Sequence, residues 1–231
     1  MKRAFDIIVS FLGLLLLSPL LFLVALVIKL DSPGPVFFRQ ERMGKGFRPF
    51  RICKFRTMIY DPTSTGRPIT AGQDSRITHI GNFLRKTKID ELPQLINVLR
   101  GEMSLVGPRP EVRKFVELFR REYEDILKIR PGITDVASIK YDDEAEILGH
   151  ATDPEEEYVR RVLPDKIKLA RDYVGRSSFL TDLRLILRTL PRLVAWRSVT
   201  MNTDGGSIAT DRRRRTGSGR SSFHRDSGSA Q

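Results

Sequence analysis

The chain has 231 residues but a single cysteine, Cys53, and only three histidines. One cysteine cannot form an intramolecular disulfide. The histidines His79, His150 and His224 are widely separated, so the sequence shows no His/Cys cluster with the spacing of a zinc site. The sequence therefore offers neither an internal disulfide nor a readable His/Cys metal site.

Nucleic-acid-binding motifs and internal repeats are also missing, although the formal net charge is +12. The segment from Arg197 onward holds seven arginines and three aspartates and contributes +4, so residues 1–196 carry +8. Such an excess attracts phosphate-bearing partners, namely lipid headgroups, nucleotides or nucleic acid. Nucleic acid is disfavoured because no helix-turn-helix, zinc-finger or aromatic-basic RNA motif is recognisable.

One long apolar run is present, over residues 7–28, and it contains no charged residue. It is long enough for a helix that crosses a hydrocarbon core, which needs about 20 apolar residues. It is too long for the apolar region of a signal peptide, roughly 7 to 15 residues, and residues 29–33 offer no small-x-small cleavage site. We expect the segment to stay attached.

Basic residues lie on both sides of this run. Lys2 and Arg3 precede it, and those that follow are Lys29, Arg39, Arg42, Lys45, Arg48 and Arg51. The positive-inside rule therefore assigns both ends to the cytoplasm. Pro19 has no N–H, so the helix should kink or break there, with the Ser18 hydroxyl satisfying a freed carbonyl. This favours a re-entrant helix-break-helix over residues 1–30; a kinked single span is the alternative.

The remainder predicts a small β-hairpin followed by helices. Strands are expected within 36–40 and 47–58, and a mobile loop covering a site within 61–74. Helices are expected over 90–101, from 111 to about 130, and from 178 to about 196. The last carries arginines opposite its apolar face, which suits an interfacial helix or a core helix with a solvated face.

These patterns predict an α-dominated, membrane-associated fold with a re-entrant helix, a small β-hairpin and amphipathic interfacial helices. A cytosolic domain is expected over 31–196. The tail over 197–231 is basic, has little to bury and is expected to be disordered. Its arginines at 212–215 either touch anionic lipid or merely keep the tail soluble.

Adjacent carboxylates at Asp90 and Glu91 are the first candidate for chemistry. At a predicted helix start they could simply cap the helix and complement its dipole. Basic residues crowd the neighbouring segments, however, and such cations keep a carboxylate ionised: Lys54, Arg56, Arg85, Lys86, Lys88, Arg109 and Arg113. An ionised carboxylate can attack phosphorus or bind Mg²⁺ together with substrate phosphates.

Arg109 is the second candidate, because Pro108 and Pro110 restrict the backbone on both of its sides. A restricted arginine suits bidentate phosphate recognition. A rigid turn with an exposed arginine is the alternative.

Five segments in order give the chain a specific resemblance. They are SPGPVFFRQ (32–40), KFRTM (54–58), IDELPQLINV (89–98), MSLVGPRP (103–110) and RPGIT (130–134). Together they resemble the bacterial sugar transferases called monotopic phosphoglycosyl transferases. The resemblance extends from the N-terminal helix to about residue 195 and leaves the tail unaccounted for.

The resemblance implies a membrane helix broken at Ser18-Pro19, Asp90 and Glu91 as the catalytic pair, and Mg²⁺ held by Asp90. It implies phosphate-binding roles for Arg85 and Arg109, with Lys54 near the pair. Many relatives have glycine where this chain has Asp135. We expect the effect of that difference to fall on substrate or membrane contacts rather than on the catalytic pair.

The implied reaction transfers a sugar 1-phosphate from a UDP-sugar to a polyprenyl phosphate such as undecaprenyl phosphate, releasing UMP. A covalent phosphosugar on Asp90 would be the intermediate. The implied location is the cytoplasmic face of the bacterial inner membrane, among its lipids, at the first membrane step of surface polysaccharide assembly. Alternatives are a nucleotide-sugar pyrophosphatase and a non-catalytic membrane assembly protein; a homodimer is left open.

Overall fold

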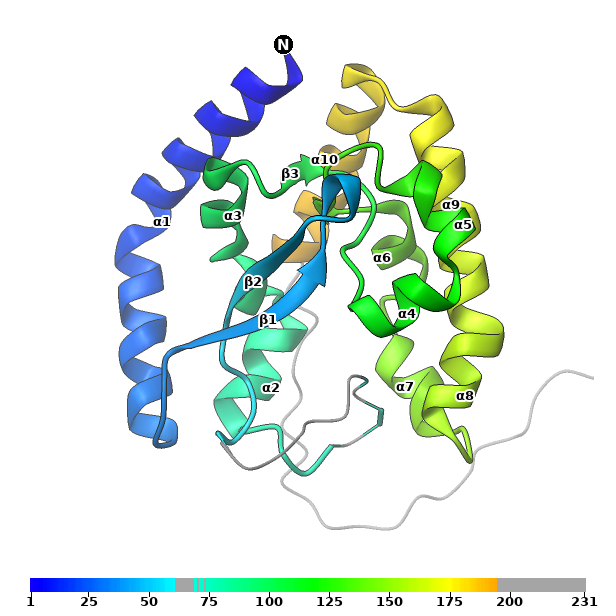
Figure 1. The fold of residues 1–231 in the computed structure, drawn as a ribbon. Helices are drawn as coiled ribbons and strands as arrows, with labels where there is room; N and C mark the ends of the chain where they lie inside the picture. The colour runs from blue at the N-terminus through cyan, green and yellow to red at the C-terminus, as the bar shows by residue number, and fades with distance from the viewer. Residues whose placement is uncertain (61–68, 70, 73, 195–231) are drawn as a thin grey trace, which may run out of the picture. The chain divides into compact units, whose positions relative to one another are not determined.

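The computed structural model describes residues 1–60, 69, 71, 72 and 74–194 (Figure 1). The tail predicted over 197–231 and most of the loop predicted over 61–74 lie outside these residues. The longer helices are α1 (Lys2–Asp31), α2 (His79–Lys86), α3 (Gln94–Arg100), α5 (Arg120–Ile126), α9 (Leu163–Arg176) and α10 (Phe179–Val194). Shorter helices are α4 (Arg113–Leu118), α6 (Val136–Lys140), α7 (Glu144–Gly149) and α8 (Pro154–Glu157).

Strands form only two small sheets among the described residues, so the fold is dominated by helices, as predicted. The strands are β1 (Phe37–Met43), β2 (Pro49–Phe55), β3 (Ser104–Val106) and β4 (Gly132–Thr134). Three tight turns complete the order: the 3-10 turns η1 (Lys45–Phe47) and η2 (Ile89–Glu91), and the π-helical turn η3 (Tyr158–Val162).

Helix α1 is continuous through Pro19. Pro19 cannot donate to the carbonyl of Leu15 one turn earlier, and the Ser18 hydroxyl donates to that carbonyl instead, at 2.8 Å. Figure 1 shows the helix axis changing direction about half way along α1, as expected where a proline interrupts the ladder. The predicted break is therefore wrong, whereas the predicted kink and the role of Ser18 are confirmed.

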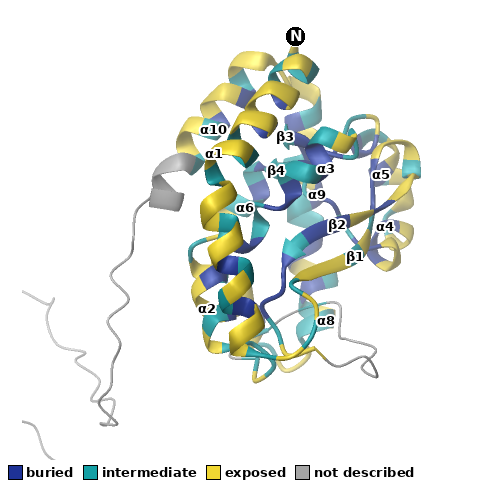
Figure 2. Ribbon diagram, turned by 90° about the vertical axis from the view of Figure 1, so that its left-hand side faces the viewer, coloured by how far each residue is buried: buried dark blue, intermediate teal, exposed yellow. Residues whose placement is uncertain are grey.

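By length and composition, α1 is the one helix in the described part of the chain that could cross a membrane. Most of its apolar side chains are exposed, and a narrow face packs on the rest of the protein (Figure 2). Near its carboxyl end, Val24 and Ile28 pack with Phe55 of β2 and Leu84 of α2. Near its amino end, the buried Asp6 accepts hydrogen bonds from β3. Both ends of α1 are thus attached to the same body.

The hairpin β1–β2 is antiparallel, with Phe37 opposite Phe55 and Met43 opposite Pro49, which confirms the predicted hairpin. Its connection uses Gly46 at φ +65°, a conformation in which glycine has no Cβ penalty. The second sheet pairs β3 with β4 in parallel, Ser104 opposite Gly132, and was not predicted. It brings the segments MSLVGPRP and RPGIT side by side.

The helix predicted from residue 111 to about 130 is two helices, α4 and α5, separated at Phe119. Phe119 has non-helical angles, φ −121° and ψ 40°, so the chain turns there. The turn lets both helices face one core, in which Phe115 and Val116 of α4 meet Tyr123 and Ile126 of α5 together with α9. The apolar residues keep their 3.6-residue spacing across Phe119, so the sequence pattern alone predicted one uninterrupted helix.

Candidate active site

The adjacent carboxylates lie in η2, the 3-10 turn between α2 and α3, and not in the first turn of the helix as predicted. Lys88 precedes this turn in the left-handed region, at φ 57° and ψ 14°. For a residue with a Cβ this conformation costs about 1 to 2 kcal/mol. The chain thereby reverses before α3 begins at Gln94, and Asp90 becomes buried.

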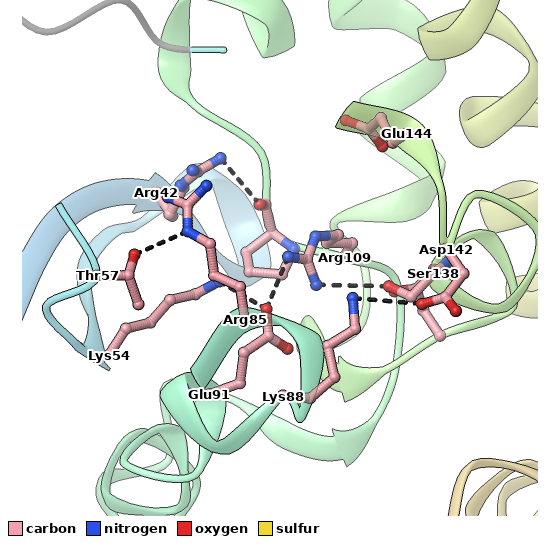
Figure 3. A network of polar contacts seen from close by, with 12 residues as sticks. Arg42, Lys54, Thr57, Arg85, Lys88, Glu91, Arg109, Ser138, Asp142 and Glu144 are labelled. Atoms are coloured by element: carbon pink, nitrogen blue, oxygen red, sulfur yellow. Dashed lines mark hydrogen bonds and ion pairs between the residues drawn. The ribbon is translucent and has the colours of Figure 1, made fainter. Parts of the chain in front are cut away.

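Glu91 is held by two cations that come from distant parts of the chain (Figure 3). Lys54 of β2 donates to Glu91 Oε1 at 2.6 Å, and Arg109 donates to the same oxygen at 2.9 Å. Burial raises the pKa of Glu91, but the charges of Arg109 and Lys54 outweigh it and hold that pKa well below its usual range. Glu91 in turn raises the pKa of Arg109. Glu91 is therefore a fixed anion.

Asp90 has a different environment from its neighbour. Its Oδ1 is buried and has no hydrogen-bond partner among the described residues. Burial raises the pKa of Asp90 to about 6, the charge of Lys54 lowers it, and the charge of Glu91 raises it further. The expectation that nearby cations keep a carboxylate ionised applies most strongly to Glu91, because Lys54 and Arg109 donate to it rather than to Asp90. Asp90 is still mostly ionised at neutral pH.

Arg85 approaches from α2 on the other side of the turn. Its Nε donates to Thr57 Oγ1 at 2.8 Å, and no described residue accepts a hydrogen bond from its terminal nitrogens. Burial lowers the pKa of Arg85, and the charge of Asp90 counteracts that effect. The guanidinium is thus oriented by Thr57 while its outer edge stays available for an anion.

Arg109 is oriented by a second group that includes Asp135. Its NH1 lies 3.4 Å from Ser138 Oγ, and Ser138 donates from both its hydroxyl and its backbone N–H to the buried Asp135 carboxylate. Asp135 is also the N-cap of α6. Asp135 is therefore connected to Glu91 through Ser138 and Arg109. The expectation that its effect falls on substrate or membrane contacts stays a prediction.

The loop that carries Arg109 is supported from behind by residues that sequence reasoning missed. Arg42 of β1 contacts the Pro110 carbonyl at 3.4 Å and Glu111 Oε1 at 3.2 Å, and the Tyr158 hydroxyl donates to Glu111 Oε2 at 2.6 Å. These residues are far apart in sequence, so no local pattern links them. Ser138 carries no local signal of its own either, because an N-cap such as Asp135 accepts from the backbone N–H of whichever residue lies three positions on.

The donors present fit Mg²⁺ better than a metal held by protein alone. The described residues contain no group of three His, Cys, Asp or Glu side chains that could hold an ion. Asp90 offers a buried oxygen without a partner, whereas Glu91 is already engaged by two cations. Mg²⁺ commonly binds one or two carboxylates together with substrate phosphates and waters. One free carboxylate beside several cations suits such a shared site.

The site therefore combines a buried carboxylate with cations that could neutralise a polyphosphate. Lys54, Arg85 and Arg109 arrive from β2, α2 and the loop after β3 and gather around η2 (Figure 3). Cations placed in this way stabilise charge that develops on phosphate oxygens. A carboxylate among them can act as a nucleophile toward phosphorus.

Comparisons with known proteins agree with this chemistry. The chain is 40% identical over 196 residues to UDP-N-acetylgalactosamine-undecaprenyl-phosphate N-acetylgalactosaminephosphotransferase of Aeromonas hydrophila, covering 82% of this chain and 42% of that protein. It is 41% identical over 198 residues to UDP-glucose:undecaprenyl-phosphate glucose-1-phosphate transferase of Caulobacter vibrioides, covering 84% and 69%. It is 42% identical over 199 residues to the exopolysaccharide production protein PSS of Rhizobium leguminosarum bv. phaseoli, covering 82% and 93%.

The chain thus spans less than half of the Aeromonas relative and nearly the whole of the Rhizobium one. A family profile described as bacterial sugar transferase matches residues 1–196, which include α1 and every side chain of the site. On this match and on the identities above, the chain belongs to the bacterial sugar transferase family.

Proposed function

We propose that this protein transfers a sugar 1-phosphate from a UDP-sugar to undecaprenyl phosphate and releases UMP, at the first membrane step of surface polysaccharide assembly. The names of the Aeromonas and Caulobacter relatives support the two substrates, and that of the Rhizobium relative supports the pathway class. The observation that carries the proposal is the buried, unpartnered Asp90 oxygen beside a Glu91 fixed by two cations.

The proposed chemistry has two steps at one phosphorus atom. An Asp90 oxygen bonds to the β-phosphorus of the UDP-sugar as the bond from that phosphorus to the bridging oxygen breaks, and UMP leaves. An oxygen of the lipid phosphate then bonds to the same phosphorus and releases Asp90. The lipid phosphate is already anionic, so the second step requires no general base.

The surrounding cations act by position and charge. Arg109 and Arg85 would bind diphosphate oxygens and offset the charge that develops on them. Bound Mg²⁺, held by Asp90, would add positive charge at the same oxygens. Glu91 has a pKa too low for proton transfer at neutral pH, so we assign it the role of aligning Lys54 and Arg109.

A re-entrant placement of α1 is part of this proposal. At the amino end of α1, Lys2 forms a 2.6 Å ion pair with Asp182 of α10. At the other end, Arg56, which follows β2, donates a 2.7 Å hydrogen bond to the carbonyl of Ser32, the residue after α1. A helix that crossed the bilayer would carry one end away from the domain. Both ends are instead attached to it, so we place both on the cytoplasmic side of the inner membrane, as the basic flanks favour.

The exposed faces of α1 and α10 support membrane contact. Apolar side chains along α1 are open, and so are Leu183 and Leu187 of α10, which the core-helix alternative would have buried (Figure 2). An apolar surface of this extent marks an interaction site. The acceptor's phosphate lies at the membrane surface, so a site attached to α1 could meet it there.

The direct test incubates purified protein with Mg²⁺, undecaprenyl phosphate and a panel of UDP-sugars while UMP release is measured. Continuous UMP release that requires the lipid supports transfer, because without the lipid each enzyme molecule can release only the one UMP that accompanies adduct formation. Sustained UMP formation without lipid would indicate the pyrophosphatase alternative, and no UMP with any sugar would indicate a non-catalytic role.

A further inference from the structure

A second charged cavity lies at the amino end of α1, apart from the active site. Its volume is about 280 Å³, and it is lined by residues of α1, η1, β3, the end of the α5–β4 connection and the start of α10. The charged residues that line it are Lys2, Arg3, Asp6, Lys45, Arg130 and Asp182. None of them belongs to the candidate active site.

The two carboxylates in this cavity already have hydrogen-bond partners, and one of them has an ion pair. Asp182 pairs with Lys2 at 2.6 Å and accepts from the Tyr173 hydroxyl at 2.5 Å. Asp6 accepts from the Ser104 hydroxyl at 2.8 Å and from the Leu105 N–H at 3.3 Å. Four cations thus face two satisfied anions, which leaves an excess of positive charge.

The remaining cations keep donors for a ligand. Arg130 uses its Nε on the Gly101 carbonyl at 2.8 Å, and no described residue accepts from its terminal nitrogens. Lys45 is exposed and has no ion-pair partner among the described residues. Arg3 holds the last carbonyls of α3, those of Val98 and Leu99, at 2.7 and 3.2 Å. The cavity is therefore pre-formed around the end of α3.

The cavity lies next to the apolar side chains at the start of α10 and the amino end of α1. Phe179 of α10 lines it and meets Phe5 of α1 edge to face, with ring centroids 5.3 Å apart. Figure 2 shows the exposed faces of α1 and α10 next to each other. The adjacent carboxylates precede α3, whereas the lining residues Arg3 and Arg130 donate to carbonyls at its far end, so a helix length of roughly 10 Å separates the two places.

We propose that this cavity binds the headgroup of an anionic bilayer phospholipid, with the acyl chains along the exposed faces of α1 and α10. A phosphodiester would give Lys45 and Arg130 the anionic partner that they do not have among the described residues. Anionic lipids also give the cytoplasmic leaflet its negative surface potential. The bound lipid would fix the amino end of α1 to α3 and α10. This role does not depend on the transferase reaction.

The test measures thermal unfolding of the full-length protein in an uncharged detergent with increasing dihexanoyl phosphatidylglycerol. Parallel titrations use dihexanoyl phosphatidylcholine and inorganic phosphate. We expect a saturable rise in Tm with phosphatidylglycerol alone. An equal rise with phosphatidylcholine would overturn the headgroup site, and an equal rise with inorganic phosphate would replace the lipid with a soluble anion.

Variants separate the cavity from general charge attraction. Lys45→Gln together with Arg130→Gln should weaken the phosphatidylglycerol response at least tenfold. Lys45→Gln alone, at an exposed residue without a partner, should weaken it several-fold while leaving the ligand-free Tm unchanged. The matched control, Arg160→Gln with Lys168→Gln, removes the same charge from exposed residues outside the cavity. An unchanged response in the cavity variants, or an equal loss in the control, contradicts the proposal.

Discussion

At the scale of single residues, the site separates two adjacent carboxylates by their surroundings. Glu91 receives both nearby cations, and Asp90 is left buried with an oxygen free. The different roles that we propose for them therefore follow from burial and partners, because the two side chains have almost the same intrinsic acidity.

Replacing Asp90 by asparagine should stop chemistry without harming the fold. We expect wild-type protein mixed with a UDP-sugar and no lipid to gain one phosphosugar mass, and Asp90→Asn to gain none, because an amide is not an anionic nucleophile. Ionised Asp90 has a pKa about two units above its usual value, so the variant should also be more stable at pH 7.5, by up to about 3 kcal/mol.

Intact-mass measurement and thermal unfolding check both expectations on the same sample. Because folding raises the pKa of Asp90, ionised Asp90 lowers the free energy of unfolding. This loss of stability is full above pH 6 and disappears as the pH falls below 4. A folded Asp90→Asn protein that still forms the adduct would exclude Asp90 as the nucleophile.

The pH dependence of adduct formation should report the ionisation of Asp90. With a pKa of about 6, the rate should fall about tenfold for each pH unit below 6. Lys54→Met removes a charge that lowers this pKa, so the acid limb of the pH–rate profile, where the rate falls with decreasing pH, should move to higher pH. Glu91→Gln removes a charge that raises it, so the limb should move to lower pH.

Single-turnover kinetics between pH 4.5 and 8 measure the position of the limb independently of the overall rate. Opposite displacements in the two variants identify Asp90 as the titrating group. If both variants keep the wild-type limb, another group controls the rate.

Asp135 should influence catalysis through Ser138 and Arg109. Asp135→Ala removes the acceptor of both Ser138 hydrogen bonds, and we expect turnover to fall about tenfold, equivalent to about 1.4 kcal/mol, as Arg109 loses orientation. Loss of the N-cap should also cost about 1 kcal/mol of stability.

Asp153 provides the matched control, because it caps α8 with two backbone hydrogen bonds away from the site. Asp153→Ala should lose similar stability with unchanged turnover. Ser138→Ala should reproduce most of the catalytic loss, and combining it with Asp135→Ala should add little, since the two residues act in series. Additive losses in the double variant would break this connection.

At the scale of elements, α1 is long and apolar enough to cross a membrane and is also part of the folded domain. At the kink at Pro19, the Ser18 hydroxyl replaces the backbone hydrogen bond that the proline cannot make. The buried face of α1 packs on α2, β2 and α3. Val24 and Ile28 are buried against Phe55 and Leu84, so the helix packs as part of the domain.

Both ends of α1 should face the cytoplasm. In a Cys53→Ala background, Ala4→Cys and Arg48→Cys should resist a membrane-impermeant maleimide in intact cells and react after the inner membrane is opened. The control is Leu16→Cys, whose parent side chain is 80% exposed in the structure and should be shielded by lipid under both conditions. Labelling of Ala4→Cys in intact cells would place the amino end outside and support the single span.

At the scale of the whole molecule, the hairpin, α2, the turn η2 and the loop after β3 each contribute charged side chains to one site, in a domain that also packs on the long apolar helix α1. In the proposed reaction the acceptor keeps its phosphate at the membrane surface, whereas the nucleotide sugar comes from the cytosol. We propose that this arrangement lets the two substrates meet.

Metal dependence belongs to this scale, because the ion would be shared between Asp90 and the substrate. Exhaustive chelation should abolish adduct formation, and added Mg²⁺ should restore it. Thermal unfolding without substrate should change little on chelation, since the described residues offer no cluster of three ligands. Full adduct formation after chelation would remove the metal from the mechanism.

The sequence by itself determined the local features of this protein. The apolar run with Pro19, the hairpin around Gly46 and the helix that follows Pro93 depend on neighbours in the chain, so periodicity and turn residues were enough to predict them. The five segments also identified the family and the pair Asp90 and Glu91, because those residues occur at short, fixed spacings.

Only the tertiary structure decided which side chains meet and how the carboxylates differ. Lys54, Arg109 and Asp135 are brought to Glu91 by the hairpin and by the parallel pairing of β3 with β4, which involve contacts between distant residues. The interruption at Phe119 and the left-handed Lys88 likewise follow from packing around them. A pKa depends on burial and on charges within a few ångströms, and neither can be read from the order of residues.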